Sequence, residues 1–289
     1  MIDKKHIKGT LIPIGGNEDK GANTSETHTL DFVEDGILAH VVKESGGLDA
    51  LIVVIPTASS IPNEVGENYV NAFEKLGCTN IKVLKLTKRE QAGDPEFLNW
   101  IKKANCVMFS GGDQSKIVDK IGGTKMHEIL QQRYLHEHFV IAGTSAGAMA
   151  MSTEMIAGGT GRDAFSKGSV EMRDGMNFFP ELIIDSHFIL RGRFGRLAEA
   201  VATFPNLIGV GLAEDTGIVI KQCNRFKIIG SGMVIIFDGS ELTHNAREFL
   251  DEGTPMSMSN LKVHVLSNSD IFYVDERRVE VLPIYAPFE

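Results

Sequence analysis

The stretch that decides the fold is Phe139-Val140-Ile141-Ala142-Gly143-Thr144-Ser145-Ala146-Gly147. An apolar run, a G-x-S-x-G turn and then good helix formers are typical of a nucleophile elbow, the sharp strand-to-helix bend that exposes a serine hydroxyl. Gly143 and Gly147 leave room for the strand and the helix to approach each other, and Ser145 can then adopt the strained backbone of the bend. A non-catalytic turn that contains glycines between a strand and a helix fits the same motif. A hydrolase therefore also needs a base, an orienting acid and oxyanion donors elsewhere in the chain.

Outward from the elbow, apolar runs alternate with amphipathic segments. Buried strands are predicted at residues 9–14, 51–55, 81–86, 106–109 and 139–142, and helices near 26–44, 62–76, 95–103 and 123–136. This β-α-β-α order predicts an α/β fold with a doubly wound, mainly parallel sheet and helices on both faces. Beyond residue 205, short apolar or alternating runs between turn residues predict antiparallel or mixed strands that extend the sheet.

No linker interrupts this pattern, so we expect one α/β domain over residues 1–289, with a strand-rich C-terminal extension over 221–289. Functional groups of such a sheet gather at the carboxyl ends of its strands. The polar segment 157–174, which contains glycines, is expected to form a mobile loop beside the site.

Composition narrows the class of protein. A net charge of -9 and a pI near 5.5 argue against a nucleic-acid partner. The first residues lack the apolar core of a signal peptide and no apolar run is long enough to span a membrane, so we expect a cytoplasmic protein without a membrane partner. The 3 cysteines lie far apart without C-x-x-C spacing, which favours buried thiols over disulfides or a metal site.

The base is predicted at His187. It ends the apolar run that closes with Asp185-Ser186, and a strand end places its imidazole near the mouth of the sheet, where it can take the Ser145 proton. A helical pattern follows over 191–204 and begins with three cations: Arg191, Arg193 and Arg196. Cations at a helix start repel one another and the helix dipole, so carboxylates of the protein or of the substrate must offset them.

The orienting acid is predicted at the end of another apolar strand, where Glu214 and Asp215 both offer a carboxylate that can hold the His187 imidazole. A turn with solvated acids fits the same pattern.

The oxyanion donors are predicted at two strand ends. The amide of Ala146 follows the serine, and either Gly112 or Asp113, after the strand at 106–109, can supply the second N–H. Gln114 is expected at the lip of the site as a polar contact to substrate. Neither a G-x-G-x-x-G fingerprint nor a Walker loop is present, which disfavours nucleotide binding.

As a set, these residues match a family. The motifs occur in the order found in cyanophycinases: Gly15-Gly16-Asn17-Glu18-Asp19-Lys20, Ser110-Gly111-Gly112-Asp113-Gln114, Gly143-Thr144-Ser145-Ala146-Gly147-Ala148, His187-Phe188 with Arg191, Arg193 and Arg196-Leu197, and Glu214-Asp215-Thr216. The chain thus resembles the cyanophycinase and peptidase E group of serine peptidases, over residues 9–220.

The resemblance implies a class I glutamine-amidotransferase-like fold, a triad of Ser145, His187 and Glu214, and no metal or cofactor. Cyanophycinases cut cyanophycin, a polyaspartate with arginines amide-linked to its side chains, into β-aspartyl-arginine dipeptides. Relatives suggest a homodimer. The family's substrate-binding positions correspond to Gln114, Asp185, Ser186, Arg191, Arg193 and Arg196.

One departure bears on substrate preference, because family members usually carry Asp-Gln-His where this chain has Asp185-Ser186-His187. Two alternatives therefore stay open: an aspartyl or isoaspartyl dipeptidase of the peptidase E kind, and a non-catalytic protein that binds anionic ligands on the same fold. A glutamine amidotransferase is disfavoured, because that chemistry normally uses a cysteine where Ser145 stands.

Overall fold

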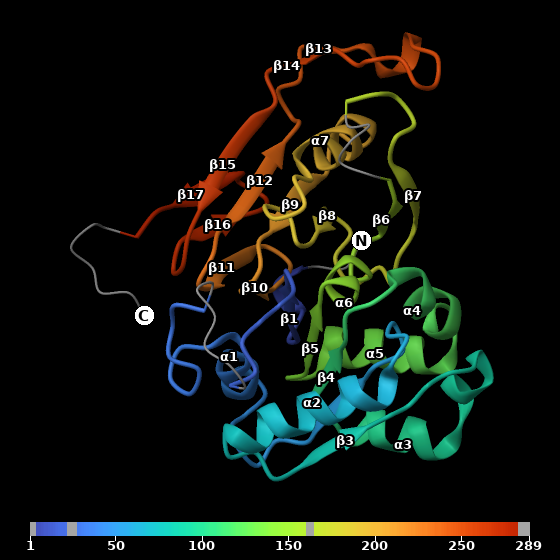
Figure 1. Cartoon of the computed structure of the whole chain (residues 1–289), viewed down its shortest axis with the longest axis vertical. Coiled ribbons are helices and arrows are strands. Elements are labelled where there is room, and N and C mark those ends of the chain that lie inside the picture. Colours follow the sequence, from blue (N-terminus) through green and yellow to red (C-terminus); the bar gives the residue numbers. More distant parts are fainter. Residues whose placement is uncertain (1–3, 22–27, 160–164, 283–289) are drawn as a thin grey trace.

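The elbow strand lies inside a nine-stranded sheet in the computed structural model of the chain, which describes residues 4–21, 28–159 and 165–282 (Figure 1). Five strands of this sheet pair in parallel, and they are β1 (Thr10–Ile14), β5 (Val140–Thr144), β4 (Cys106–Phe109), β2 (Ile52–Ile55) and β3 (Ile81–Val83), in that spatial order. They lie where the apolar runs predict strands.

Antiparallel strands complete the same sheet on the other side of β1. They are β10 (Thr216–Lys221), β11 (Arg225–Gly230), β16 (Ile271–Tyr273) and β17 (Arg278–Glu280). The predicted α/β class, with a parallel sheet extended by antiparallel C-terminal strands, is confirmed.

Helices cover both faces of the parallel half. One face packs against α1 (Ile37–Glu44) and α2 (Pro62–Lys75), and the other against α3 (Pro95–Lys103), α4 (Gln114–Ile121) and α5 (Lys125–His136). Side chains alternate between the two faces, as in β2, where Ile52 and Val54 lie in one apolar cluster and Val53 and Ile55 in the other.

Two helices differ from the sequence pattern. The helix predicted over 26–44 begins only at Ile37, after turns, and residues 22–27 lie outside the described part of the chain. The pattern missed α4, whose 8 residues are short for a periodicity argument. Its first turn is capped by the Asp113 carboxylate, which accepts from Ser115 N at 2.9 Å.

A separate four-stranded sheet was not predicted. It has the order β15-β12-β9-β8 and is built from β8 (Leu182–Asp185), β9 (Ile208–Leu212), β12 (Val234–Asp238) and β15 (Lys262–Leu266). One face packs against α7 (Phe194–Thr203). The opposite face shares an apolar cluster with β10, β11 and β16, so this sheet stacks against the antiparallel half and lies above the parallel strands in Figure 1.

The remaining elements are short. Within the described residues they are the helix α6 (Ala146–Met149), the hairpin of β6 (Glu154–Gly158) and β7 (Glu171–Asp174), and the hairpin of β13 (His244–Asn245) and β14 (Met258–Ser259). Short 3-10 turns are described at Lys4–His6, Arg89–Gly93 and Ala246–Phe249. The segment 157–174, predicted to be a mobile loop, contains the end of β6 and all of β7, and its residues 160–164 lie outside the described residues.

All three cysteines are buried free thiols. Within the residues that the structure describes, no helix is long and apolar enough to cross a membrane. The same residues contain no cluster of three or more His, Cys, Asp or Glu side chains suited to a metal ion.

Candidate active site

Ser145 occupies the bend between β5 and α6 and has a strained backbone. Its φ is +50° and its ψ is −107°, a combination that L residues rarely adopt. A Cβ on Gly143 would lie 2.6 Å from the backbone of Gly147, and a Cβ on Gly147 would lie 2.6 Å from the Phe109 carbonyl oxygen. The two glycines of the motif are therefore required for the close contact of α6 with β5 and β4.

A cavity of about 420 Å³ opens above Ser145. It lies at the carboxyl ends of β1, β4 and β5, the edge where a parallel sheet carries its functional groups, and beside the end of β8 from the second sheet. Its walls are mostly polar. Asn68 and Tyr69 of α2 line it together with residues at or after these strand ends: Gly16, Asn17, Glu18, Lys20, Gly111, Gly112, Thr144, Ser145, His187 and Arg191.

His187 follows β8 and is held over the loop after β1. Its amide donates to the Gly15 carbonyl at 2.8 Å, and its φ is +47°. A Cβ on Gly16 would lie 2.5 Å from His187 Nε2, so the missing side chain of Gly16 makes room for the imidazole ring. The Nδ1 atom lies 3.1 Å from Glu214 Oε1.

The two candidate acids have different partners. Glu214 contacts the imidazole, whereas the buried Asp215 carboxylate accepts from the Asp19 amide at 3.0 Å and from Ser231 Oγ at 2.6 Å. Asp215 thus ties the acidic turn to neighbouring loops, and Glu214 is the carboxylate next to His187.

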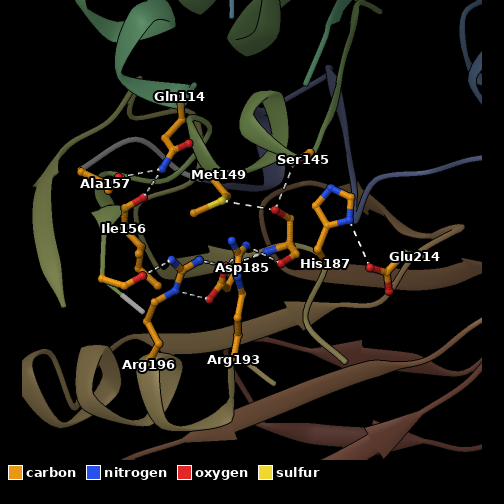
Figure 2. Close-up of polar contacts among 12 residues, drawn as sticks. Gln114, Ser145, Met149, Ile156, Ala157, Asp185, His187, Arg193, Arg196 and Glu214 are labelled. Carbon is orange, nitrogen blue, oxygen red and sulfur yellow. Dashed lines mark hydrogen bonds and ion pairs between the residues drawn. The ribbon is translucent and has the colours of Figure 1, made fainter. Parts of the chain in front are cut away.

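Figure 2 shows the His187 ring between Ser145 and Glu214. Among the described residues, Ser145 Oγ makes its hydrogen bond to Ser186 Oγ at 3.4 Å and makes none to His187. Catalytic hydrogen bonds are often long or poorly aligned without substrate. Proton transfer to His187 therefore requires the Ser145 hydroxyl to turn from Ser186 toward the imidazole.

The surroundings of His187 favour its neutral form. Burial of the ring and the nearby positive charge of Arg191 lower its pKa below the ordinary 6.5, although the hydrogen bond to Glu214 acts in the opposite direction. A neutral imidazole at pH 7 can accept a proton, which is the property that a general base needs.

The predicted oxyanion donors are not equivalent. The Asp113 amide donates to the Ala58 carbonyl at 3.0 Å and is therefore occupied. The amides of Gly112 and Ala146 have no hydrogen-bond acceptor among the described residues. Gly112 lines the cavity, and Ala146 directly follows Ser145 at the start of α6.

The predicted substrate-binding residues separate into two groups. Arg191 lines the cavity, and its guanidinium has no ion-pair or hydrogen-bond partner in the part of the chain that the structure describes. Ser186 is buried and lies beside Ser145, and its Oγ is 3.4 Å from Ser145 Oγ and 3.3 Å from Met149 Sδ.

The other residues make internal contacts (Figure 2). The fully buried Asp185 carboxylate pairs with Arg196, through Nε at 2.9 Å, and with Arg193 at 3.1 Å, which fixes the end of β8 to the start of α7. Gln114 donates to the carbonyls of Ile156 and Ala157 at 2.9 and 3.1 Å, and so ties α4 to β6. None of the three side chains of Gln114, Arg193 and Arg196 lines the described cavity.

Sequence reasoning assigned no role to several cavity residues. Glu18 and Lys20 were recognised only as part of a family motif, and Asn68 and Tyr69 lie on the face of α2 that turns to the cavity. The sequence feature that could have identified Glu18 is a carboxylate close after the glycine pair Gly15-Gly16 at the end of a strand. The place of α2 beside that strand end depends on the fold, and local sequence does not encode it.

The chain is similar to known peptidases along most of its length. The family model described as "Peptidase family S51" matches residues 21–228. A cyanophycinase of Trichormus variabilis (strain ATCC 29413 / PCC 7937) is 34% identical over 279 residues, which is 96% of this chain and 90% of that protein. A cyanophycinase of Geminocystis herdmanii (strain PCC 6308) is 32% identical over 267 residues, 92% of this chain and 94% of that protein.

Solved structures are similar in fold. A peptidase from an acI-B1 Actinobacterium has a TM-score of 0.62 and 22% identity, covering 91% of this chain and 98% of that chain. A putative peptidase E protein from Listeria monocytogenes EGD-e has a TM-score of 0.50 and 16% identity, covering 74% of this chain and 94% of that chain. At these identities the likeness shows the fold alone.

Proposed function

Since the chain belongs to peptidase family S51 and is a serine peptidase, we propose that it hydrolyses cyanophycin, multi-L-arginyl-poly-L-aspartate, to β-Asp-Arg dipeptides. The name shared by its relatives supports this choice of substrate. The observation that carries the proposal is that Ser145 on its strained elbow and the His187–Glu214 pair meet at one cavity.

The proposed reaction is acyl transfer through an ester. Ser145 Oγ attacks the scissile carbonyl carbon while His187 Nε2 takes its proton, and the Glu214 carboxylate stabilises the imidazolium through Nδ1. The amides of Ala146 and Gly112 hold the negative oxygen of the tetrahedral intermediate. His187 then gives the proton to the leaving amine as the carbon–nitrogen bond breaks.

Water completes the cycle. His187, neutral again, takes a proton from a water molecule that attacks the ester carbon, and the bond to Ser145 Oγ breaks as this oxygen regains a proton from the imidazolium. A pKa of His187 below its ordinary value keeps the base available for both halves of the reaction near neutral pH.

The cavity is lined by the cations Lys20 and Arg191, which can meet the free α-carboxylates that the linked arginines of cyanophycin carry. The Arg191 guanidinium at the wall has no partner among the described residues, whereas the Lys20 ammonium pairs with Glu18 at 2.8 Å. We assign to Arg191 the binding of a substrate carboxylate, because a guanidinium can form two parallel hydrogen bonds with that group. Ser186, beside the nucleophile, is the residue that we expect to adjust which peptide fits.

The test is product analysis by mass spectrometry. The purified full chain and its Ser145→Ala variant are incubated with cyanophycin granules and, separately, with Asp-X and β-Asp-X dipeptides. Release of β-Asp-Arg from the granules by the wild type alone is the expected result. Hydrolysis of dipeptides without attack on granules would identify a peptidase E-like dipeptidase instead. No hydrolysis of any substrate would favour the non-catalytic binding protein.

We further propose that the chain forms a homodimer and acts in the cytoplasm, as the resemblance and the composition suggest. Sedimentation equilibrium of the purified chain measures its assembly, and fractionation of the producing cells measures its location.

A further inference from the structure

The loop after β1 contacts every segment of the proposed triad. Its Gly15 carbonyl accepts from the His187 amide at 2.8 Å, and its Gly16 carbonyl accepts from the Asp215 amide, next to Glu214, at 2.9 Å. The amide of Ser145 donates to the Ile14 carbonyl at 2.8 Å, just before this loop begins. The triad segments are therefore held together through one stretch of backbone.

Glu18 is the side chain that joins this loop to the elbow. Its Oε2 accepts from Thr144 Oγ1 at 2.6 Å, and Thr144 directly precedes the nucleophile. Its Oε1 accepts from the Tyr69 hydroxyl of α2 and pairs with Lys20 Nζ at 2.8 Å. Glu18 thus links the loop, the elbow and α2, although the proposed reaction assigns it no step.

The carboxylate remains ionised despite its burial. Burial alone would raise the pKa of Glu18, but the Lys20 charge and hydrogen bonds from Lys20, Thr144 and Tyr69 outweigh it, so its pKa lies below the ordinary value. An ionised carboxylate accepts stronger hydrogen bonds than a neutral group does. The hydrogen bond from Thr144 Oγ1 to Glu18 is therefore stronger than one to a neutral acceptor would be.

The hydrogen bond between Glu18 and Thr144 acts next to the strained backbone of Ser145. A residue with such φ and ψ is strained and persists only where its surroundings over-determine it. We propose that Glu18 is a positioning residue of the peptidase site, which fixes Thr144 and thereby holds Ser145 in line with His187. This inference rests on the proposed function, since it takes Ser145 as the nucleophile.

The test uses the full chain and compares two substitutions that weaken or remove the hydrogen bond between Thr144 and Glu18. Glu18→Gln removes the charge, and Thr144→Val removes the hydroxyl at nearly constant shape. In each variant kcat for cyanophycin is expected to fall roughly 10- to 100-fold, the loss that a displacement of about 1 Å can cause. KM of Thr144→Val should change by less than about threefold, because this change leaves Arg191 and the Lys20–Glu18 pair of the cavity in place. Thr144→Ser, which keeps the hydroxyl, should lose much less than Thr144→Val.

The double variant provides a second readout. Because both changes act on the Glu18–Thr144 hydrogen bond, Glu18→Gln combined with Thr144→Val should be little slower than the slower single variant. The control is Glu199→Gln, which alters another buried carboxylate, one that accepts from the Gly168 amide at 2.8 Å away from the cavity. Its kcat per folded molecule should equal that of the wild type.

Failure of this inference is distinct from failure of the proposed function. If the wild type does not react with a fluorophosphonate at Ser145, the proposed function fails. If the wild type reacts and Glu18→Gln is labelled and turns over within about twofold of it, the positioning role is wrong. A fall in kcat that only tracks the loss of folded protein would equally overturn it.

Discussion

At the scale of single residues, Ser145 and His187 both have a positive φ, a backbone conformation that residues other than glycine rarely adopt. The elbow motif predicted the first of them. The second follows from the contact of the His187 amide with the loop after β1, which no local pattern encodes. Sequence reasoning therefore proposed Ser145 and His187, which both line one cavity, but it left the choice between Glu214 and Asp215 open, and the fold shows that Glu214 is the one that contacts the imidazole.

The positive charge of Arg191 is expected to affect the pH dependence of activity through the pKa of His187. Burial and the charge of Arg191 both lower the pKa of His187, and a base works only in its deprotonated form, so the acidic limb of kcat/KM is expected below pH 6.5. Replacing Arg191 by Gln removes one of these causes. The pKa of His187 then rises and the limb moves to higher pH.

The control for this prediction is Arg191→Lys, which keeps the charge and should keep the limb near its wild-type position. Both profiles are measured as kcat/KM against pH, so that they report the free enzyme. A limb that stays in place or moves to lower pH in Arg191→Gln would show that the Arg191 charge does not act on His187.

At the scale of elements, the Asp185 network joins β8 to α7. Asp185 is 0% exposed, and its partner Arg196 is 4% exposed, so removal of one charge leaves the other buried and unpaired. Asp185→Asn is expected to lower the free energy of unfolding by about 3–5 kcal/mol, the usual cost of breaking a buried ion pair. Urea denaturation measures this loss.

A surface pair serves as the matched control. Asp119 contacts Arg173 at 2.7 Å, with both side chains substantially exposed, and Asp119→Asn should cost less than about 1 kcal/mol. Equal losses in the two variants would mean that the Asp185 network does not stabilise the fold.

The strands also show which parts of the fold could be predicted from the sequence and which could not. The strands at 106–109 and 139–142 were predicted because apolar runs buried on both faces carry their own signal. The separate sheet of β8, β9, β12 and β15 was missed, because strand pairing depends on partners far apart in the sequence. β12, for example, pairs with both β9 and β15, and similar apolar runs fit either sheet equally well.

At the scale of the whole molecule, we propose that residues 1–289 form one domain, as the absence of a linker suggests. One apolar cluster contains Val53 of β2, Phe226 of β11 and Ile236 of β12, and so joins the parallel strands, the antiparallel strands and the second sheet. We expect a single cooperative unfolding transition, because loss of either sheet exposes this shared cluster. Circular dichroism and Trp100 fluorescence during urea denaturation should coincide.

Separate transitions would contradict one domain. Trp100 lies on α3, beside the parallel half, so its fluorescence reports that region, whereas circular dichroism reports all elements. A fluorescence change well before or after the main loss of ellipticity would show that the C-terminal strands unfold as a unit of their own.

The central claim, that Ser145 is the nucleophile, is tested most directly by covalent labelling with a fluorophosphonate, followed by peptide mapping in a mass spectrometer. We predict one label, on the peptide that contains Ser145, with loss of cyanophycin hydrolysis in proportion to labelling. Ser145→Ala should take up no label and hydrolyse nothing, while its free energy of unfolding stays within about 1 kcal/mol of the wild type. A label on another residue, or undiminished hydrolysis by Ser145→Ala, would contradict the account.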